Sequence, residues 1–167
     1  MGHCTRALAA RGAIVSALDI SQAALDRVVD ATERRYLAGA IHQLPADSFD
    51  LAISYLVSQH MRDAELRQQI QHVVRSLKPT GIFAMQFTYG WGQREGTVND
   101  DLTPAKGGSV QRTLHRVAEM AHDAGAAIAW AGLNAHWIEH HASWYAVHVI
   151  PTSHLEAVYL KSGFQPA

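Results

Sequence analysis

The chain has 167 residues, of which 48% are hydrophobic and 17% are charged, and its formal net charge at pH 7 is −1. This length and hydrophobic content predict one well-buried core. The near-neutral charge gives no electrostatic footprint for nucleic acid, so the expected partner is a small molecule. The single cysteine, Cys4, excludes an intramolecular disulfide and a cysteine-rich zinc site.

The sequence contains no run of 18 apolar residues, and no charged and then apolar leader ends in a cleavage site. We therefore expect a soluble, cytoplasmic protein that has no membrane partner. Neither an internal repeat nor a linker is evident. Residues 1–150 are expected to form one domain, and residues 151–167 a C-terminal tail.

The first quarter of the chain alternates between helical and strand patterns. Gly12 follows a short apolar helix, and a glycine tolerates the left-handed conformation that often ends a helix. Ser21 is a suitable N-cap for the next helix. The continuous apolar run at 13–18 is typical of a strand buried on both faces. The expected elements are a helix at 5–11, a strand at 13–18, a helix at about 21–34 and a weaker strand at 36–41.

The rest of the chain continues this alternation. An apolar stripe at helical spacing runs from Leu66 to Leu77, and Pro79 cannot continue a helix. Residues 89–108 are polar and rich in glycine, which predicts a long loop over a binding site. The expected elements are a buried strand at 49–56, further strands at 81–88, 126–133 and 143–150, and helices at 63–77 and 110–124.

Alternating strands and helices predict right-handed crossovers onto a mostly parallel sheet. In such sheets, ligands bind outside the carboxyl ends of the strands. The loops that matter for function are therefore those that follow Asp19, Ile41, Ser54, Thr88 and Leu133.

Four segments together resemble the class I S-adenosylmethionine-dependent methyltransferases of the small single-domain type: GHCTRALAARGAIVSALDIS, LPADSFDLAISYLVSQHM, LRQQIQHVVRSLKPTGIFAMQF, and AGAAIAWAGL with SWYAVHVI. The resemblance implies an α/β, Rossmann-like sheet, mostly parallel with an antiparallel last strand. It also implies S-adenosyl-L-methionine as cofactor and methyl transfer to a small-molecule acceptor. The alternative is a catalytically inactive remnant that acts as a binding or regulatory module. Whether the chain forms a homodimer is left undecided.

The resemblance assigns cofactor-binding roles to particular residues. Gly2 matches the last glycine of a glycine-rich turn that approaches the cofactor closely. Asp19 matches the acid that accepts hydrogen bonds from both ribose hydroxyls, which suits the two oxygens of a carboxylate. The family usually has an acid before the adenine, whereas this chain reads Gly39-Ala40-Ile41. The remaining cofactor-binding positions implied are Ile20, Ala40, Ile41, Ser54 and Tyr55, with His42 as a further adenine neighbour.

The first strand and the first two glycines of the family pattern would precede Gly2. We therefore expect an N-terminally truncated form of such a protein, or a chain that begins at an internal methionine. The truncated chain is accordingly expected to bind the cofactor more weakly and to be less active than a complete enzyme.

The catalytic residues are left open, with His60, Tyr89 and His141 as candidates. His60 could be a general base or a structural histidine, and Tyr89, with Trp91, could line an acceptor pocket or fix the loop to the core. His140 or His141 could contact the acceptor. The motif HWIEH at 136–140 matches a zinc-protease pattern, but that pattern requires a helix, and here a loop between two strands is expected. No metal site is therefore predicted.

Overall fold

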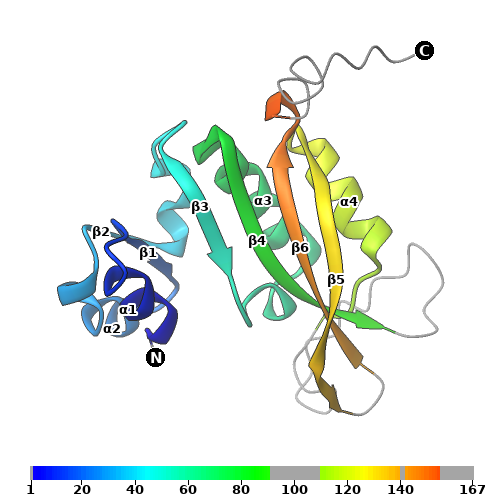
Figure 1. The fold of residues 1–167 in the computed structure, drawn as a ribbon, viewed down its shortest axis with the longest axis horizontal. Helices are drawn as coiled ribbons and strands as arrows, with labels where there is room; N and C mark the ends of the chain where they lie inside the picture. Colours follow the sequence, from blue (N-terminus) through cyan, green and yellow to red (C-terminus); the bar gives the residue numbers. More distant parts are fainter. Residues whose placement is uncertain (1, 91–109, 140–141, 155–167) are drawn as a thin grey trace. The chain divides into compact units, whose positions relative to one another are not determined.

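The structure is a computed structural model that describes residues 2–90, 110–139 and 142–154. The chain divides into two compact units, Met1–Leu44 and Pro45–Ala167, and each unit contains its own sheet (Figure 1). The units are labelled here as the first and the second unit.

The first unit contains a parallel two-stranded sheet. Its elements are α1 (His3–Ala9), β1 (Ser16–Asp19), α2 (Gln22–Asp26), the 3-10 helix η1 (Val29–Ala31), β2 (Arg34–Leu37) and the 3-10 helix η2 (Ala38–Gln43). β1 and β2 pair in register from Ser16 opposite Arg34 to Asp19 opposite Leu37. The predicted Ser21 cap is confirmed, because its side chain accepts a hydrogen bond from the Ala24 amide at 3.3 Å.

Two expectations for this unit are wrong. A single helix over residues 21–34 does not form. The carbonyl of Arg27, which a continuing helix would bond to residue 31, accepts a hydrogen bond from the Arg6 side chain, and the Ala31 amide bonds to Val28 instead. The run at 13–18 is not buried on both faces either: Ile14 is 82% exposed and precedes the four paired residues of β1.

The second unit contains a four-stranded sheet. Its elements are β3 (Phe49–Ser54), the 3-10 helix η3 (Ser58–His60), α3 (Asp63–Ser76), β4 (Leu77–Gly90), α4 (Leu114–Asp123), β5 (Ala126–Glu139) and β6 (Ala142–Pro151). The strand order is β3-β4-β6-β5, in which β3 and β4 are parallel and β6 is antiparallel to both of its neighbours. The predicted antiparallel last strand is confirmed.

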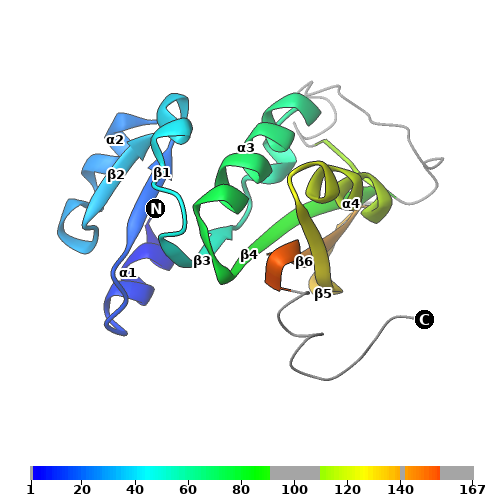
Figure 2. The ribbon, with the colours of Figure 1, turned by 90° about the horizontal axis from the view of Figure 1, so that it is seen from above.

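Helices α3 and α4 cover one face of this sheet (Figures 1 and 2). The apolar stripe predicted on α3 is buried throughout, and Leu66 and Ile70 have no exposed surface. Alternate residues of β4 face these helices. Three of them are buried: Phe83, Met85 and Phe87. Burial of these apolar side chains forms the core of the second unit.

The opposite face of the sheet is more open. Ile53, Ala84, His148 and Trp130 lie in register across the four strands and therefore share this face. Ile53 is 46% exposed and Trp130 is 50% exposed. Among the described residues, no strand pairs with the outer edge of β3, so the expectation of a fully buried strand at 49–56 is wrong.

The ends of the long strands also differ from the prediction. β4 extends to Gly90, so Tyr89 lies on a strand and not in a loop, opposite Ser143 of β6. β5 extends to Glu139, so His136 also lies on a strand, which excludes the helix that the zinc-protease pattern requires. Most of the predicted loop, with Trp91, and residues 140, 141 and 155–167 lie outside the described residues.

Candidate functional site

The carboxyl ends of β1 and β2 carry four of the predicted cofactor-binding positions: Asp19, Ile20, Ala40 and Ile41. Because the strands are parallel, the turn after Asp19 and the helix η2 after Leu37 lie at the same edge. Asp19 is exposed, and its Oδ1 accepts a hydrogen bond from the Ser21 amide at 2.9 Å, which fixes the orientation of the carboxylate. Among the described residues, Oδ2 has no protein donor, so it is available to a ligand hydroxyl.

Apolar side chains accompany this carboxylate. Ile20 follows Asp19 and is 85% exposed, so its side chain is accessible to a ligand at this edge. Ala40 and Ile41 lie on η2 and are half-buried. The edge thus combines one carboxylate with apolar surface, and η2 carries no acid.

Gly2 lies at the N-cap of α1 with φ +75°. A Cβ at this position would lie 2.5 Å from Cγ1 of Val28, which is too close for any real contact. The requirement for glycine therefore follows from packing within the first unit and from the left-handed backbone. The close approach to a cofactor that the resemblance implies stays a prediction.

In the second unit, the chain makes a tight turn where β3 ends. Ser54 is buried, and its Oγ lies 3.1 Å from the Oγ of Ser58, while Tyr55 between them is exposed. Leu56 has φ 58°, a left-handed conformation that costs a non-glycine residue about 1–3 kcal/mol. Such a residue persists only where its surroundings hold it, so the segment from Ser54 to Met61 is stabilised by other contacts.

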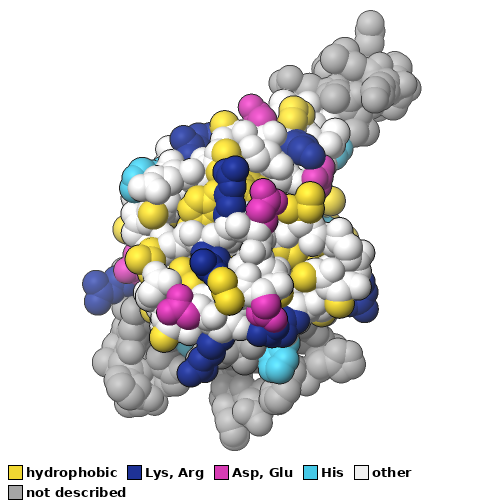
Figure 3. All heavy atoms as spheres, turned by 90° about the vertical axis from the view of Figure 1, so that its left-hand side faces the viewer, with side chains coloured by type: hydrophobic (Ala, Val, Ile, Leu, Met, Phe, Trp, Pro, Cys, Tyr) yellow, Lys and Arg dark blue, Asp and Glu magenta, His cyan; other side chains and the backbone are white. Residues whose placement is uncertain are grey.

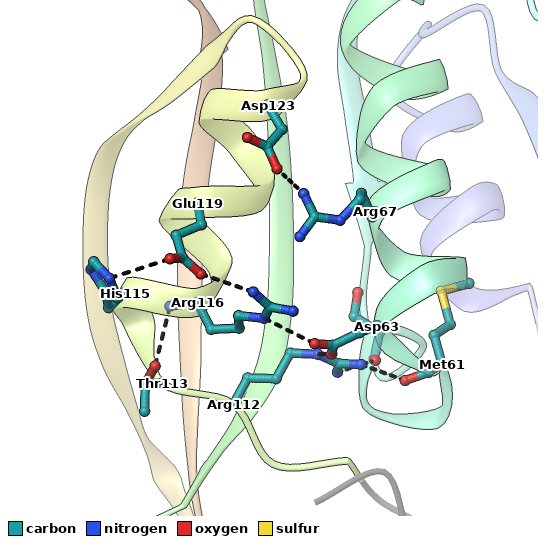
Figure 4. A network of polar contacts seen from close by, with 10 residues as sticks. Met61, Asp63, Arg67, Arg112, Thr113, His115, Arg116, Glu119 and Asp123 are labelled. Atoms are coloured by element: carbon teal, nitrogen blue, oxygen red, sulfur yellow. Dashed lines mark hydrogen bonds and ion pairs between the residues drawn. The ribbon is translucent and has the colours of Figure 1, made fainter. Parts of the chain in front are cut away.

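A polar network of α3, α4 and the residues before α4 supplies some of these contacts (Figure 4). The Arg112 side chain has no exposed surface, and its Nε donates to Oδ1 of Asp63 at 2.8 Å. Its Nη1 donates to the Ser58 carbonyl at 3.1 Å, and its Nη2 to the Met61 carbonyl at 2.5 Å. Arg116 donates to the other oxygen of Asp63 at 3.0 Å.

The second arginine of this network is held by two acids. A hydrogen bond to Glu119, and then the bond to Asp63, raise the pKa of Arg116 above its ordinary value, and the hydrogen bond from Arg116 lowers the pKa of Glu119. Both shifts favour the charged forms of Arg116 and Glu119. Arg67 of α3 also pairs with Asp123 of α4, but this pair does not reach the turn after β3.

Buried polar groups gather near the carboxyl ends of β3 and β4. Gln59, Gln86 and Thr88 are each less than 5% exposed. Gln59 Oε1, Gln86 Oε1 and Thr88 Oγ1 have no hydrogen-bond partner in the described part of the chain. Orphaned buried polar atoms are uncommon in folded proteins and indicate a site that water or a ligand completes.

The structure places two of the three catalytic candidates. His60 is exposed at the end of η3, and its Nε2 lies 3.1 Å from Nε2 of Gln59. Tyr89 is half-buried, and its ring centroid lies 5.0 Å from that of Tyr145 on β6, so the ring packs on the sheet. His141 lies outside the described residues.

Sequence reasoning missed Arg112, Gln59, Gln86 and Thr88. A signal existed for two of them, because Gln86 and Thr88 alternate with Met85 and Phe87 in a period of two. Arg112 carried no such signal. Its partner Asp63 is 49 residues away in the chain, and only tertiary structure brings the two together.

The surface agrees with the near-neutral composition. On the face that Figure 3 draws, acidic and basic side chains of the described residues are interspersed and not gathered by sign. Within the described ranges, none of the helices is long enough and apolar enough to span a bilayer.

Comparison with known proteins identifies the family. The family model described as "Methyltransferase domain" matches residues 1–85, which is half of the chain. The chain belongs to this methyltransferase family. An uncharacterized methyltransferase of Synechocystis sp. (strain ATCC 27184 / PCC 6803 / Kazusa) is 38% identical over 87 residues, which cover 50% of this chain and 41% of that relative. The match thus spans less than half of the relative's length.

Solved structures support the same fold. The PH0226 protein of Pyrococcus horikoshii OT3 has a TM-score of 0.63 at 19% identity, over 90% of this chain and 77% of that chain. The magnesium protoporphyrin IX methyltransferase of Synechocystis PCC 6803, solved with bound SAH, has a TM-score of 0.59 at 19% identity, over 90% and 69% of the two chains. The predicted Rossmann-like fold of a methyltransferase is therefore confirmed.

Proposed function

We propose that this methyltransferase-family chain binds S-adenosylmethionine and acts in methyl transfer to a small-molecule acceptor. The observation that carries the proposal is the position of Asp19, an oriented and exposed carboxylate at the carboxyl end of a parallel strand. Ligands of open α/β sheets bind at such ends. The solved relatives with bound SAH have the same fold, which agrees with this cofactor.

The residues of the first unit fit the nucleoside part of this cofactor. Asp19 accepts hydrogen bonds from the ribose hydroxyls through Oδ2 and the remaining lone pairs of Oδ1. Ile20 and Ile41 offer apolar contact to the adenine ring, and the backbone at Ala40 supplies its polar contacts because η2 has no acid. Gly2 lies at the start of α1, and its backbone would contact the methionine part of a bound cofactor.

The residues of the second unit assist the reacting part. Ser54 ends β3 and Tyr55 follows it, and both would contact the methionine portion of a bound cofactor. When bound, S-adenosylmethionine supplies a methyl group that is already activated for transfer by the positive charge on sulfur. The chain therefore has mainly to orient the acceptor and to receive a proton where the acceptor loses one. His60, with Tyr89 and His141, is the candidate for these roles.

A calorimetric titration with S-adenosylmethionine tests the proposal directly. We expect saturable binding and competition by S-adenosylhomocysteine. The same protein is then supplied with S-adenosylmethionine and a panel of small-molecule acceptors, and the formation of S-adenosylhomocysteine is measured. Absence of binding at millimolar cofactor would refute the proposal, and binding without turnover of any acceptor would favour a binding module over an enzyme.

A further inference from the structure

The segment from Ser54 to Met61 needs an external support to keep its conformation. It contains Leu56 in the left-handed region, and Tyr55, Leu56 and Val57 are each more than 40% exposed. These three residues contribute little core packing of their own. The short helix η3 adds two backbone hydrogen bonds, from the His60 amide to the Val57 carbonyl at 2.9 Å and from the Met61 amide to the Ser58 carbonyl at 3.3 Å.

Arg112 supplies that support from a distant part of the chain. Its guanidinium group binds the carbonyls of Ser58 and Met61, one at each side of η3 (Figure 4). The neighbouring backbone adds two bonds: the Val110 amide donates to the Gln59 carbonyl at 2.7 Å, and the Arg112 amide donates to the Thr88 carbonyl at 2.8 Å. The residues before α4 therefore connect η3 to the end of β4.

The positive charge of the buried Arg112 side chain is balanced by the carboxylate of Asp63. The side chain has no exposed surface, and Asp63, which is 15% exposed, accepts its Nε hydrogen bond. A planar guanidinium can satisfy one carboxylate and two carbonyls at fixed angles, whereas a lysine ammonium offers donors from a single atom. Burial of a charge is costly without such partners, so this arrangement has one well-defined geometry.

We propose that Arg112 is a positioning residue that holds the Ser54–Met61 segment in the conformation that binds the cofactor. This inference rests on the proposed function, in which Ser54 and Tyr55 contact the methionine portion. Arg112 acts through the carbonyls of Ser58 and Met61 and does not contact the cofactor. Asp63 is the acid that keeps its guanidinium in place.

The test uses Arg112→Lys and not Arg112→Ala, because alanine would remove a buried guanidinium group together with all three of its hydrogen bonds, and loss of the fold would then obscure the result. Lysine keeps the charge beside Asp63 but cannot bind both carbonyls in the same geometry. Arg116→Lys is the matched control. It makes the same chemical change at the other arginine bound to Asp63, without a hydrogen bond to either carbonyl in the structure.

Two measurements separate this inference from the proposed function. Hydrogen exchange followed by mass spectrometry reports the protection of a peptide over 55–62 without any cofactor. Calorimetry reports the affinity for S-adenosylmethionine. Arg112→Lys is expected to speed exchange in 55–62 and to weaken affinity on the order of 10-fold, which is the loss that one hydrogen bond accounts for. Arg116→Lys is expected to change neither.

The outcomes are distinct. Unchanged exchange in Arg112→Lys, or equal effects of both lysine variants, would overturn the positioning role. If the unaltered protein binds no S-adenosylmethionine, the proposed function fails, and the proposal that Arg112 positions a cofactor-binding segment fails with it. The exchange measurement still shows in that case whether Arg112 holds the segment, so the two failures can be told apart.

Discussion

Replacing Asp19 by asparagine should weaken binding of S-adenosylmethionine with little effect on the fold. In the structure, Oδ1 of Asp19 accepts from the Ser21 amide at 2.9 Å. Asparagine keeps an oxygen for that bond, so the turn into α2 is preserved. The second carboxylate oxygen becomes an NH2 group, which cannot accept a hydrogen bond from a ribose hydroxyl.

The expected magnitude follows from the loss of one charge-assisted hydrogen bond. Such a bond contributes about 1.5–3 kcal/mol, which corresponds to a loss of affinity of about 10- to 150-fold. Asp19 is exposed, so water competes for its oxygens and the lower part of this range is expected. Calorimetric titration of the variant and the unaltered protein measures the change, and a thermal melt of each confirms that the fold is intact.

Asp26→Asn provides the matched control for Asp19→Asn. Asp26 is also an exposed carboxylate of the first unit, and it accepts a hydrogen bond from the Gln22 side chain at 2.8 Å. Its replacement changes the net charge equally but leaves the carboxyl ends of β1 and β2 untouched. Equal affinities of both variants and the unaltered protein would refute the assignment of Asp19 as the ribose-binding residue.

Three further predictions concern stability. Gly2→Ala should lower the melting temperature more than Gly12→Ala. Both glycines have positive φ, which costs an alanine about 1–2 kcal/mol, but only a Cβ at Gly2 meets a neighbouring side chain. Equal losses of melting temperature in the two variants would contradict this prediction. Leu66→Ala should reduce the free energy of unfolding in urea by about 2–5 kcal/mol, and Leu51→Ala, on the open sheet face, by less than about 1 kcal/mol. The hydrogen bond from Arg6 lowers the pKa of Asp30, so the contribution of this pair is complete above about pH 4 and is lost as the pH falls through that lowered pKa. Asp30→Asn should therefore lower the melting temperature at pH 7 but not at pH 2, and an equal loss at both would argue against the ion pair.

Much of the fold could be predicted from local patterns alone. The stripe from Leu66 to Leu77 identified α3, and Ser21 identified the start of α2, because helical spacing and capping depend on residues that are close in the sequence. The position of Asp19 at the end of a strand was predictable in the same way. The order of these patterns along the chain was sufficient to indicate the methyltransferase family.

Tertiary structure alone decided how far each strand is buried and what holds the turn after β3. Leu51 and Ile53 belong to a run that was expected to be buried, but both are exposed because they lie on the open face of β3, an edge strand in the described sheet. No pattern in the neighbouring sequence predicts the left-handed conformation of Leu56 or the hydrogen bond from Arg112 to the Ser58 carbonyl. The physical reason is that a hydrogen bond between residues 54 positions apart forms only when the sheet and its helices have brought them together, so no window of the sequence contains it.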